Sequence, residues 1–498
     1  MDISLILKMA ADAEPHRVGL TCDGRHWTYA ALWAAATGAA VEITASGCSH
    51  VALLDTGSEA APIALIGAAL ATMPYCPLNY RLADADLAAL LTRIEPAFII
   101  GDVDRVKKLA PNSGHTVFSR YDFVTLAEKA AVPDREAGEG ESIAVQLFTS
   151  GTTAAPKAAI LRHSNLVSYI FGTVEFGAAE PAEAALVSVP PYHIAGIAAL
   201  LSSIYALRRI ILLPAFDPQT WIDLCAREKA TNAFVVPTML SRIVEMLDAA
   251  SNKPDLTHLR AIAYGGGRMP IELITRALEL FPDTNFTNAY GLTETSSTVA
   301  LLGPDEHRAA YGSEDPEIRA RLASVGKPLP SIELEIRDED GKVLPPGEAG
   351  EIYVRGDQVS GEYRDRSALI HGGWFPTRDA GFLDEDGYLF LSGRADDVIV
   401  RGGENISPGE IEDVLLTHPS IADAAAVGVP STEWGEAVAV VISLKGEHPG
   451  DAEIKTLIRD RLRSSRVPER ILVVETLPYN EMGKLLRLEV RRLLQTAG

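Results

Sequence analysis

Short apolar runs alternate with longer amphipathic stretches over the first 300 residues of the chain. The runs that predict strands lie at 51–55, 97–101, 143–148, 185–189, 210–213, 233–236 and 261–264. Helices are predicted between them, at 64–73, 196–207, 218–228, 238–249 and 270–280. Because strands that alternate with helices usually form parallel sheets, this pattern predicts an α/β fold with helices on both faces of the sheet.

The pattern changes after residue 324. Short strands, separated by Gly and Pro turns, are predicted at 332–337, 350–354 and 388–391 and indicate a small β-rich subdomain. A glycine- and charge-rich stretch follows, and beyond it the helices 408–417 and 451–461 flank the strands 424–429 and 437–444. We therefore predict a large N-terminal domain of α/β subdomains plus the β-rich subdomain, residues 1–394, and a small, mobile α+β C-terminal domain, residues 395–498.

Charge and composition narrow the class of protein. The 498 residues include 45 Lys and Arg against 67 Asp and Glu, a net charge of −22, which disfavours binding to nucleic acid or to an anionic membrane. The apolar stretch 64–73 is too short to span a membrane, and the N-terminus lacks a signal peptide's basic segment. Because no CxxC spacing occurs, we expect a cytoplasmic protein with buried thiols at Cys22, Cys48, Cys76 and Cys225.

A polar loop between Thr149 and Lys157 is the strongest local signal of chemistry. It follows a predicted strand and contains Ser150, Gly151, Thr152 and Thr153. Successive backbone N–H groups, hydroxyl donors and one cation suit a polyphosphate ligand. The spacing is not that of a Walker A loop. Taken alone, the stretch is also compatible with an ordinary polar surface loop.

Eight segments of the chain, taken together, carry more specific motifs: 77–82, 149–157, 191–193, 264–267, 288–295, 374–381, 393–406 and 480–484. In this order they resemble the motifs of the adenylate-forming superfamily of acyl- and aryl-CoA synthetases, adenylation domains and luciferases. The resemblance implies an ATP-dependent acyl-CoA synthetase that needs Mg²⁺. Such an enzyme activates a carboxylic acid as acyl-AMP, releases pyrophosphate, and then forms a thioester with CoA.

The resemblance also implies roles for the residues around the phosphates. The loop residues Thr149 to Thr153 would hold the β- and γ-phosphates, with Lys157 assisting. Glu294 would hold Mg²⁺, an ion that usually takes one or two carboxylates. Thr293 would donate to the α-phosphate, and Lys484 would bridge that phosphate and the substrate carboxylate.

For the nucleoside, the resemblance implies that Tyr290 stacks on adenine. Asp379 would accept hydrogen bonds from both ribose hydroxyls, and Arg394 would add a ribose or phosphate contact. Glycine lacks a Cβ and lets backbone approach the base closely, which is the role implied for Gly265, Gly266 and Gly267.

The family likeness places the acyl pocket and the thiol channel as well. His193 would act as a gate between them, although a buried histidine at a helix start is the simpler interpretation. Small residues predict a roomy, apolar pocket; they are Gly196, Gly267 and Ser296. No aspartate stands nearby to hold an ammonium group, so an amino acid substrate is disfavoured. Asp396 is the predicted hinge, and Gly403 and Trp434 are predicted to line the CoA channel.

Some positions depart from the family pattern. Ala154 and Ala158 stand where relatives usually have glycine, at a cost of about 1 kcal/mol if the backbone needs φ > 0. Glu469 stands where CoA-using relatives often have a basic residue, which leaves Arg466 and Arg470 as candidate contacts for the CoA phosphate. Whether the acceptor is free CoA or a carrier-protein pantetheine thiol therefore stays open.

Three further possibilities accompany the main hypothesis. One is a standalone adenylation enzyme that loads a carrier protein, and another activates a different oxyacid for transfer to an amine. A non-catalytic nucleotide-binding paralogue is disfavoured because Lys157, Glu294 and Lys484 are all present. The sequence does not identify the acid, and it leaves a homodimer open.

Overall fold

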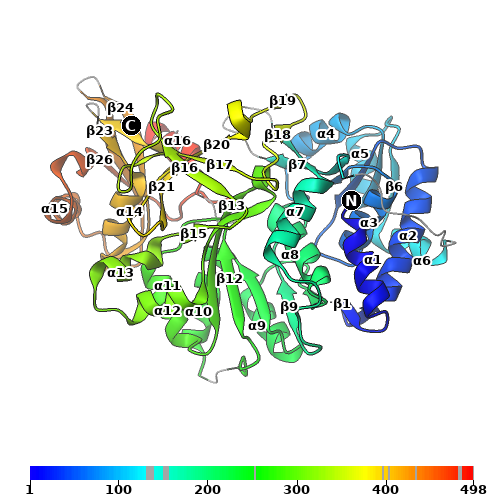
Figure 1. Ribbon diagram of the computed structural model, residues 1–498. Coiled ribbons are helices and arrows are strands. Elements are labelled where there is room, and N and C mark those ends of the chain that lie inside the picture. Colours follow the sequence, from blue (N-terminus) through cyan, green and yellow to red (C-terminus); the bar gives the residue numbers. More distant parts are fainter. Residues whose placement is uncertain are drawn as a thin grey trace.

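The computed structural model describes residues 1–130, 140–149, 156–251, 254–394, 397–401, 404–431, 434–480 and 485–496 (Figure 1). Within these ranges the chain forms sheets of nine, eight, five and four strands. The nine- and eight-stranded sheets and the four-stranded sheet make up the large N-terminal part, and the five-stranded sheet belongs to the small C-terminal part. The predicted α/β fold class is thus confirmed.

The nine-stranded sheet has the order β15-β14-β13-β12-β11-β9-β10-β1-β2. Its strands from β1 to β13 along this order are parallel, whereas β2, β14 and β15 pair with their neighbours antiparallel. The strands are β1 (Val18–Cys22), β2 (Arg25–Thr28), β9 (Ala184–Val187), β10 (Arg209–Leu212), β11 (Asn232–Val235), β12 (Ala261–Gly265), β13 (Asn285–Leu292), β14 (Ser297–Leu302) and β15 (Lys327–Pro328).

Helices cover both faces of this sheet. Alternate residues of β10 belong to different apolar cores: Ile210 joins one core and Ile211 the other. The first core contains residues of α1 (Ser4–Ala13), α2 (Tyr29–Ala45), α3 (Ala60–Leu70), α7 (His163–Thr173) and α8 (Ile194–Tyr205). The second contains residues of α9 (Pro218–Arg227), α10 (Pro237–Ala249), α11 (Ile271–Leu280) and α12 (Pro304–Gly312), and the short α13 (Pro316–Ala320) follows α12.

The eight-stranded sheet has the order β19-β18-β8-β7-β4-β3-β5-β6. Its strands are β3 (His50–Leu54), β4 (Tyr75–Pro77), β5 (Ala97–Gly101), β6 (Thr116–Phe118), β7 (Ile143–Thr149), β8 (Lys157–Arg162), β18 (Glu362–Tyr363) and β19 (Arg366–Ser367). Its helices are α4 (Asp84–Arg93), α5 (Val103–Leu109) and α6 (Arg120–Lys129). The predicted strands between 143 and 264 therefore divide between two sheets, since β7 joins this one.

The four-stranded sheet is antiparallel and corresponds to the predicted β-rich subdomain. Its order is β16-β17-β20-β21, formed by β16 (Glu333–Arg337), β17 (Gly350–Arg355), β20 (Phe375–Leu383) and β21 (Leu389–Arg394). Its core includes Tyr290 of β13, so it packs directly on the edge of the nine-stranded sheet.

The five-stranded sheet closes a core of its own. It consists of β22 (Ile399–Arg401), β23 (Glu404–Ile406), β24 (Ile421–Ser431), β25 (Gly435–Leu444) and β26 (Arg470–Val473). Its helices are α14 (Pro408–Leu416), α15 (Asp451–Arg461) and α16 (Arg487–Thr496). Two apolar clusters on this sheet take all their buried members from residues between 399 and 494.

Other expectations from the sequence can be compared with the structure. The four cysteines are free and buried, as predicted. The predicted strand 97–101 and helix 451–461 have the observed bounds, and most other elements differ at their ends by a few residues. The antiparallel strands β8 and β14 were not predicted. No helix in the described ranges has the length and apolar character that crossing a membrane requires.

Candidate active site

The carboxyl ends of the parallel strands β9, β11, β12 and β13 meet at one edge of the nine-stranded sheet. The segment with His193 follows β9, the three glycines 265–267 end β12, and Tyr290 lies near the end of β13, shortly before Glu294. Ligands of open α/β sheets bind at this edge. The structure therefore brings the predicted gate, nucleotide and metal segments to a common place.

Gly265 permits the close approach of two neighbouring strands. It lies beside Ala289 in the β12–β13 ladder, where a Cβ would stand 2.2 Å from the Ala289 carbonyl oxygen. Gly266 has φ +80°, a left-handed conformation that favours glycine. Gly267 is exposed next to them, and its predicted contact with the acyl group stays a prediction. The two strands thus approach each other closely at this turn, and no side chain of its own covers the turn's backbone.

Asp379 on β20 is held by two side chains. The Tyr290 hydroxyl donates to its Oδ2 at 2.6 Å, and Arg394 Nε lies 3.1 Å from its Oδ1. Arg394 also donates to the Thr377 carbonyl at 3.1 Å. Burial and the Asp379 charge raise the pKa of Tyr290 well above its usual value, so its hydroxyl remains a donor. The three predicted nucleoside residues thus form a connected group, and their mutual hydrogen bonds were not predicted.

Glu294 is buried in a short 3₁₀ turn (Thr293–Thr295) after β13. Its Oε1 accepts a hydrogen bond of 2.7 Å from the Tyr363 hydroxyl. Its backbone carbonyl accepts from the amides of Ser360 and Gly361, at 2.9 and 3.1 Å. Sequence reasoning missed these partners because β18 lies about 70 residues further along the chain, and no local pattern marks it.

One oxygen of the Glu294 carboxylate is available as a ligand for a metal ion. In the described part of the chain no hydrogen bond or ion pair engages its Oε2. The same part holds no group of three or more His, Cys, Asp or Glu side chains arranged around a metal. An Mg²⁺ ion here would take its remaining ligands from phosphate oxygens and water, as is usual for this ion.

The turn after Glu294 is strained. Ser296 has φ 58° and Ser297 has φ 119°, conformations that non-glycine residues rarely adopt. The buried amide of Gln358 clamps this turn, since its Nε2 donates to the carbonyls of Thr295 and Thr298 at 3.1 and 2.7 Å. The Ser296 hydroxyl is fully buried and has no hydrogen-bond partner, and its predicted place in the acyl pocket stays a prediction.

Thr149 and Lys157 lie opposite each other where β7 and β8 meet. The loop between them carries Ser150, Gly151, Thr152 and Thr153, and these residues lie outside those that the structure describes. Lys157 Nζ stands 5.8 Å from the centre of the Tyr363 ring. Ala158 pairs with Phe148 and does not have a positive φ, so the backbone cost considered for it does not arise.

His193 immediately precedes α8. Its Nε2 is buried without a hydrogen-bond partner, and burial, aided by the Arg81 charge, lowers its pKa to about 4. The imidazole is therefore neutral near pH 7, and its predicted role as a gate stays a prediction. A Cβ on Gly196 would lie 2.8 Å from the Pro190 carbonyl oxygen, so this first turn admits no larger residue. Helix α8 packs against β14, which begins just after Ser296.

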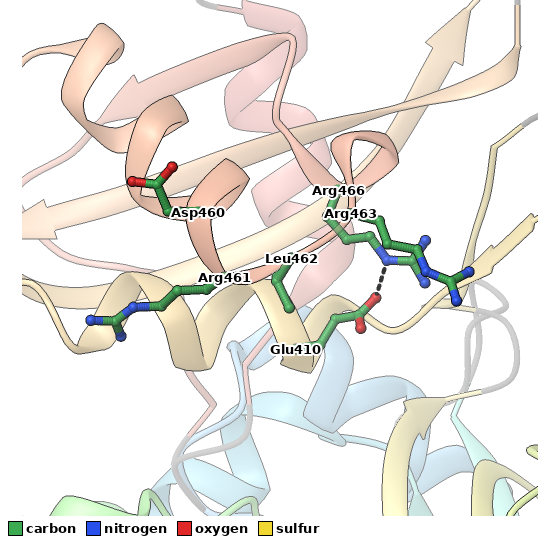
Figure 2. Close-up of a pocket in the computed structure, with 6 residues that line it drawn as sticks. All are labelled: Glu410, Asp460, Arg461, Leu462, Arg463 and Arg466. Atoms are coloured by element: carbon green, nitrogen blue, oxygen red, sulfur yellow. Dashed lines mark hydrogen bonds and ion pairs between the residues drawn. The ribbon is translucent and has the colours of Figure 1, made fainter.

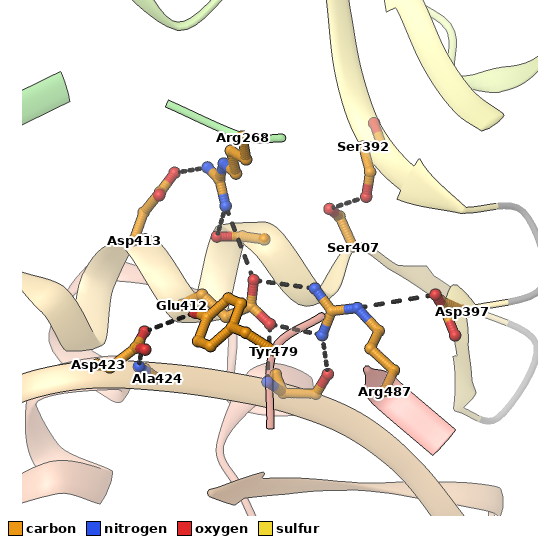
Figure 3. Close-up of polar contacts among 12 residues, drawn as sticks. Arg268, Ser392, Asp397, Ser407, Glu412, Asp413, Asp423, Ala424, Tyr479 and Arg487 are labelled. Carbon is orange, nitrogen blue, oxygen red and sulfur yellow. Dashed lines mark hydrogen bonds and ion pairs between the residues drawn. The ribbon is translucent and has the colours of Figure 1, made fainter. Parts of the chain in front are cut away.

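The residues on either side of Lys484 are held by contacts with the rest of the C-terminal part. Residues 481–484 lie outside the described ranges, but Tyr479 and Leu485 on either side pair as an antiparallel bridge. The Tyr479 hydroxyl donates to Asp423 at 3.1 Å (Figure 3). Arg487 donates to both carboxylate oxygens of Glu412, at 2.6 and 3.0 Å. Both ends of the lysine segment are thus anchored to the C-terminal sheet and to α14.

Helix α14 also contacts the N-terminal part. Arg268, directly after the three glycines, donates to the Gly409 carbonyl at 2.7 Å and to the Asp413 carboxylate (Figure 3). The Ser407 hydroxyl donates to the Ser392 carbonyl at 2.6 Å. Sequence analysis did not predict these contacts, which connect the nucleotide edge of the large sheet to the helix that anchors the lysine segment.

The predicted hinge Asp396 and channel residue Gly403 lie outside the described ranges. Next to the hinge, Asp397 lies 3.7 Å from Arg487 and 3.4 Å from Arg491. Trp434 is 43% exposed, and the guanidinium of Arg401 stands 5.7 Å from its ring. The exposed indole is compatible with the channel role predicted for it.

A hollow of about 620 Å³ lies between α14 and the end of α15 (Figure 2). Three arginines line it together with Leu462 and two carboxylates, Glu410 and Asp460. One of these arginines, Arg466, is 2.8 Å from Glu410 and also contacts Glu404. Its charge is therefore largely neutralised within the protein.

The sequence is similar to known enzymes over almost its full length. The AMP-binding enzyme family matches residues 7–364, and the AMP-binding enzyme C-terminal domain matches residues 410–484. A 2-succinylbenzoate–CoA ligase of Geobacillus kaustophilus is 33% identical over 98% of this chain and 97% of its own. A fatty acid–[acyl-carrier-protein] ligase, ScoC of Streptomyces coeruleorubidus, is 30% identical over 97% of this chain and 94% of its own.

Solved structures show the same likeness. The o-succinylbenzoate CoA synthetase of Bacillus subtilis with its acyl-adenylate intermediate has a TM-score of 0.84 and 28% identity, covering 98% of this chain and 97% of that chain. The amide bond synthetase McbA of Marinactinospora thermotolerans has a TM-score of 0.86 and 28% identity, covering 99% of each chain. The match over residues 7–364 spans more than half of the sequence, and the chain therefore belongs to the AMP-binding enzyme family, the adenylate-forming superfamily that its motifs indicated.

Proposed function

We propose that the chain is an ATP-dependent acid:CoA ligase, which forms acyl-AMP and pyrophosphate and then an acyl-CoA thioester. The observation that carries this proposal is the placement of two fixed carboxylates at the end of β13. Asp379 is held by Tyr290 for a ribose, and Glu294 is held by Tyr363 beside Lys157 for a metal and phosphates. Two relatives that match this chain over almost its full length are named as ligases, which supports the same activity.

In the first half-reaction, a carboxylate oxygen of the acid attacks the α-phosphorus of ATP and pyrophosphate leaves. Two anions must meet, so the site has to align them and offset their charge. Asp379 would fix the nucleoside, and Lys157 with the preceding loop would neutralise the β- and γ-phosphates. Thr293 would donate to the α-phosphate. Mg²⁺ bound at Glu294 would offset negative charge on the phosphate oxygens.

Lys484 supplies the remaining positive charge in this proposal. Its ammonium group would contact both the substrate carboxylate and the α-phosphate as charge moves between them. The anchored base of its segment, Tyr479–Leu485 and Arg487–Glu412, limits how that lysine can be presented. A preorganised cation loses less free energy to reorientation during the reaction.

In the second half-reaction, the pantetheine sulfur attacks the acyl carbonyl and AMP leaves. We propose that the C-terminal domain turns about Asp396, so that Gly403 replaces Lys484 near the adenylate and lines the path of the thiol. The neutral His193 imidazole would stand where the acyl pocket meets this path. Lys484 is therefore assigned to the first half-reaction alone.

A panel of acids tests the activity. ATP–pyrophosphate exchange is measured with fatty, aryl and dicarboxylic acids, and the best acid is then offered CoA, a phosphopantetheinyl carrier protein or an amine. Exchange with at least one acid and thioester formation with CoA are the expected results. Exchange without any thioester would instead favour an enzyme that passes the adenylate to an amine, and no exchange with any acid would refute the proposal.

Loading of a carrier protein is the second candidate. Arg466 is paired with Glu404 and Glu410, and Glu469 pairs with Arg401 at 2.7 Å, so these side chains offer little free positive charge to a CoA 3′-phosphate. This candidate predicts a higher kcat/KM for a carrier protein than for CoA. The free, buried thiols and the proposed use of ATP support a cytoplasmic location for this protein, whichever acceptor it uses.

Gly403→Leu tests the thiol path. A pantetheine arm must pass close to backbone, and a leucine side chain would fill that clearance. We expect pyrophosphate exchange to change little, thioester formation to fall at least about tenfold, which is about 1.4 kcal/mol in barrier height, and acyl-adenylate to accumulate on the enzyme. Unchanged thioester formation would remove Gly403 from the path, and loss of both steps with a lower Tm would indicate a structural turn instead.

Arg268→Ala tests the contact between the two parts. The pair with Asp413 is partly exposed, so its loss should change the balance between domain orientations by no more than about fivefold, since such pairs contribute up to about 1 kcal/mol. Fluorescence energy transfer between labels on the two parts would report the shift. Asp413→Ala should produce a smaller shift in the same direction, because Arg268 can still donate to the Gly409 carbonyl, and the double variant should match Arg268→Ala. If the distance distributions of all three variants equal that of the wild type, this contact does not influence the orientation.

A further inference from the structure

Tyr363 lies between the two groups that the proposed function places on the phosphates. It belongs to β18, which pairs antiparallel with β8, so that Tyr363 is opposite Ala159. Strand β8 begins at Lys157, directly after the loop assigned to the phosphates. On its other side the Tyr363 hydroxyl reaches Glu294 Oε1 at 2.7 Å. One side chain therefore connects the sheet that carries the loop to the turn that carries the carboxylate.

The phenol ring and its hydroxyl have separate surroundings. Lys157 Nζ lies 5.8 Å and the Arg366 guanidinium 5.7 Å from the ring centre, distances within the range of cation–π contacts. Burial, followed by the charge of Glu294, raises the pKa of the Tyr363 hydroxyl above its usual value. The phenol is thus protonated at neutral pH, and its hydroxyl donates to the Glu294 carboxylate.

The neighbouring backbone supports the same carboxylate residue. The amides of Ser360 and Gly361 donate to the Glu294 carbonyl, and the Ser360 hydroxyl donates to the Ile160 carbonyl of β8. The segment 358–363 therefore holds Glu294 at its backbone as well as at its side chain. In a carboxylate fixed in this way, Oε1 accepts the hydrogen bond from the phenol. The same bond fixes the direction in which Oε2 points.

We propose that Tyr363 is a positioning residue for metal-dependent nucleotide binding, which acts by fixing Oε1 of Glu294 so that Oε2 serves the divalent cation that accompanies ATP. This inference rests on the proposed function. It assigns no proton transfer to Tyr363. Removing an outer hydrogen-bond partner of a metal ligand typically lowers metal affinity or activity by tenfold or more.

Tyr363→Phe separates this role from a packing role, because it keeps the ring beside Lys157 and removes only the hydroxyl. ATP binding is measured by calorimetry in EDTA and at increasing Mg²⁺, alongside the Mg²⁺ dependence of pyrophosphate exchange. We expect ATP affinity in EDTA to be unchanged and the Mg²⁺ concentration for half-maximal exchange to rise about tenfold. Tyr353→Phe is the matched control, since its hydroxyl lies 3.5 Å from Glu351 outside the site, and it should match the wild type.

A double variant establishes whether Tyr363 acts through Glu294. In a Glu294→Gln background, Tyr363→Phe should change the Mg²⁺ dependence by less than about twofold, because residues that act as a unit are not additive. Full additivity, an unchanged Mg²⁺ dependence of Tyr363→Phe, or an equal loss of ATP binding in EDTA would each overturn the proposal. If the wild type shows no exchange with any acid, the proposed function fails instead, and calorimetry still tests the role of Tyr363.

Discussion

Replacing Lys484 by alanine is expected to slow acyl-adenylate formation by at least ~100-fold, because the variant loses a cation aligned with charge that develops in the transition state. Conversion of pre-made acyl-adenylate into thioester should remain close to the wild-type rate. The two half-reactions are measured separately, the first by pyrophosphate exchange and the second by single-turnover reaction of synthetic acyl-AMP with the thiol.

Lys445→Ala is the control for this result. Lys445 is an exposed lysine of the same C-terminal part, at the end of β25, so its removal changes the net charge equally. It should leave both half-reactions unchanged. A Lys484 variant that loses both half-reactions to the same extent would contradict the division of labour proposed for the C-terminal domain.

Asp379→Ala is expected to raise the KM for ATP by at least about 100-fold, since two hydrogen bonds to a charged acceptor contribute roughly 1.5–3 kcal/mol each. The change would also leave Arg394 and the Tyr290 hydroxyl without the carboxylate that they contact. The KM for the acid should change much less, because Asp379 is assigned to the nucleoside. Initial-rate kinetics of exchange at fixed acid and varied ATP provide the measurement.

Tyr290→Phe refines the interpretation of Asp379. It keeps a ring for the adenine and removes the hydroxyl that holds Asp379, so we expect a rise in the ATP KM of about tenfold. Glu351→Gln on the neighbouring strand β17 is the matched control, since its amide oxygen still accepts from the Arg378 backbone. An ATP KM that is unaffected by Asp379→Ala would place the ribose elsewhere.

Local patterns in the sequence were sufficient to predict most helices and strands of this fold. The apolar run 97–101 predicts β5 with its observed bounds, and the periodicity of 451–461 does the same for α15. The order of the strands within the sheets was harder to predict from the sequence. Strand β7 looks like a continuation of the alternating pattern, yet it joins β4 and β8 instead of β9, because pairing is decided by tertiary packing and not by local periodicity.

The candidate site, too, could be predicted only in part from the sequence. Family-like motifs identified Glu294, Tyr290 and Asp379, and the structure places the last two in direct contact. Gln358 lies in a turn and Tyr363 in the two-residue strand β18. Both were missed, because a single amide or phenol in such a short segment carries no spacing signal. Their significance depends on partners 60 to 69 positions away that only the folded chain brings near.

The self-contained core of the C-terminal sheet has a consequence for how the enzyme is assembled. In the described ranges, the polar contacts between this part and the rest include those of Arg268 and Ser392 with α14 and its start, and the hydrogen bond from the Val398 amide to the Arg394 carbonyl beside the connection. So sparse an interface gives little affinity by itself. In the proposed function, the peptide connection would instead maintain a high effective concentration of the lysine segment at the nucleotide, of millimolar order for a short linker. A chain cut at this connection would form two folded pieces that recover adenylation only when mixed at concentrations near that value.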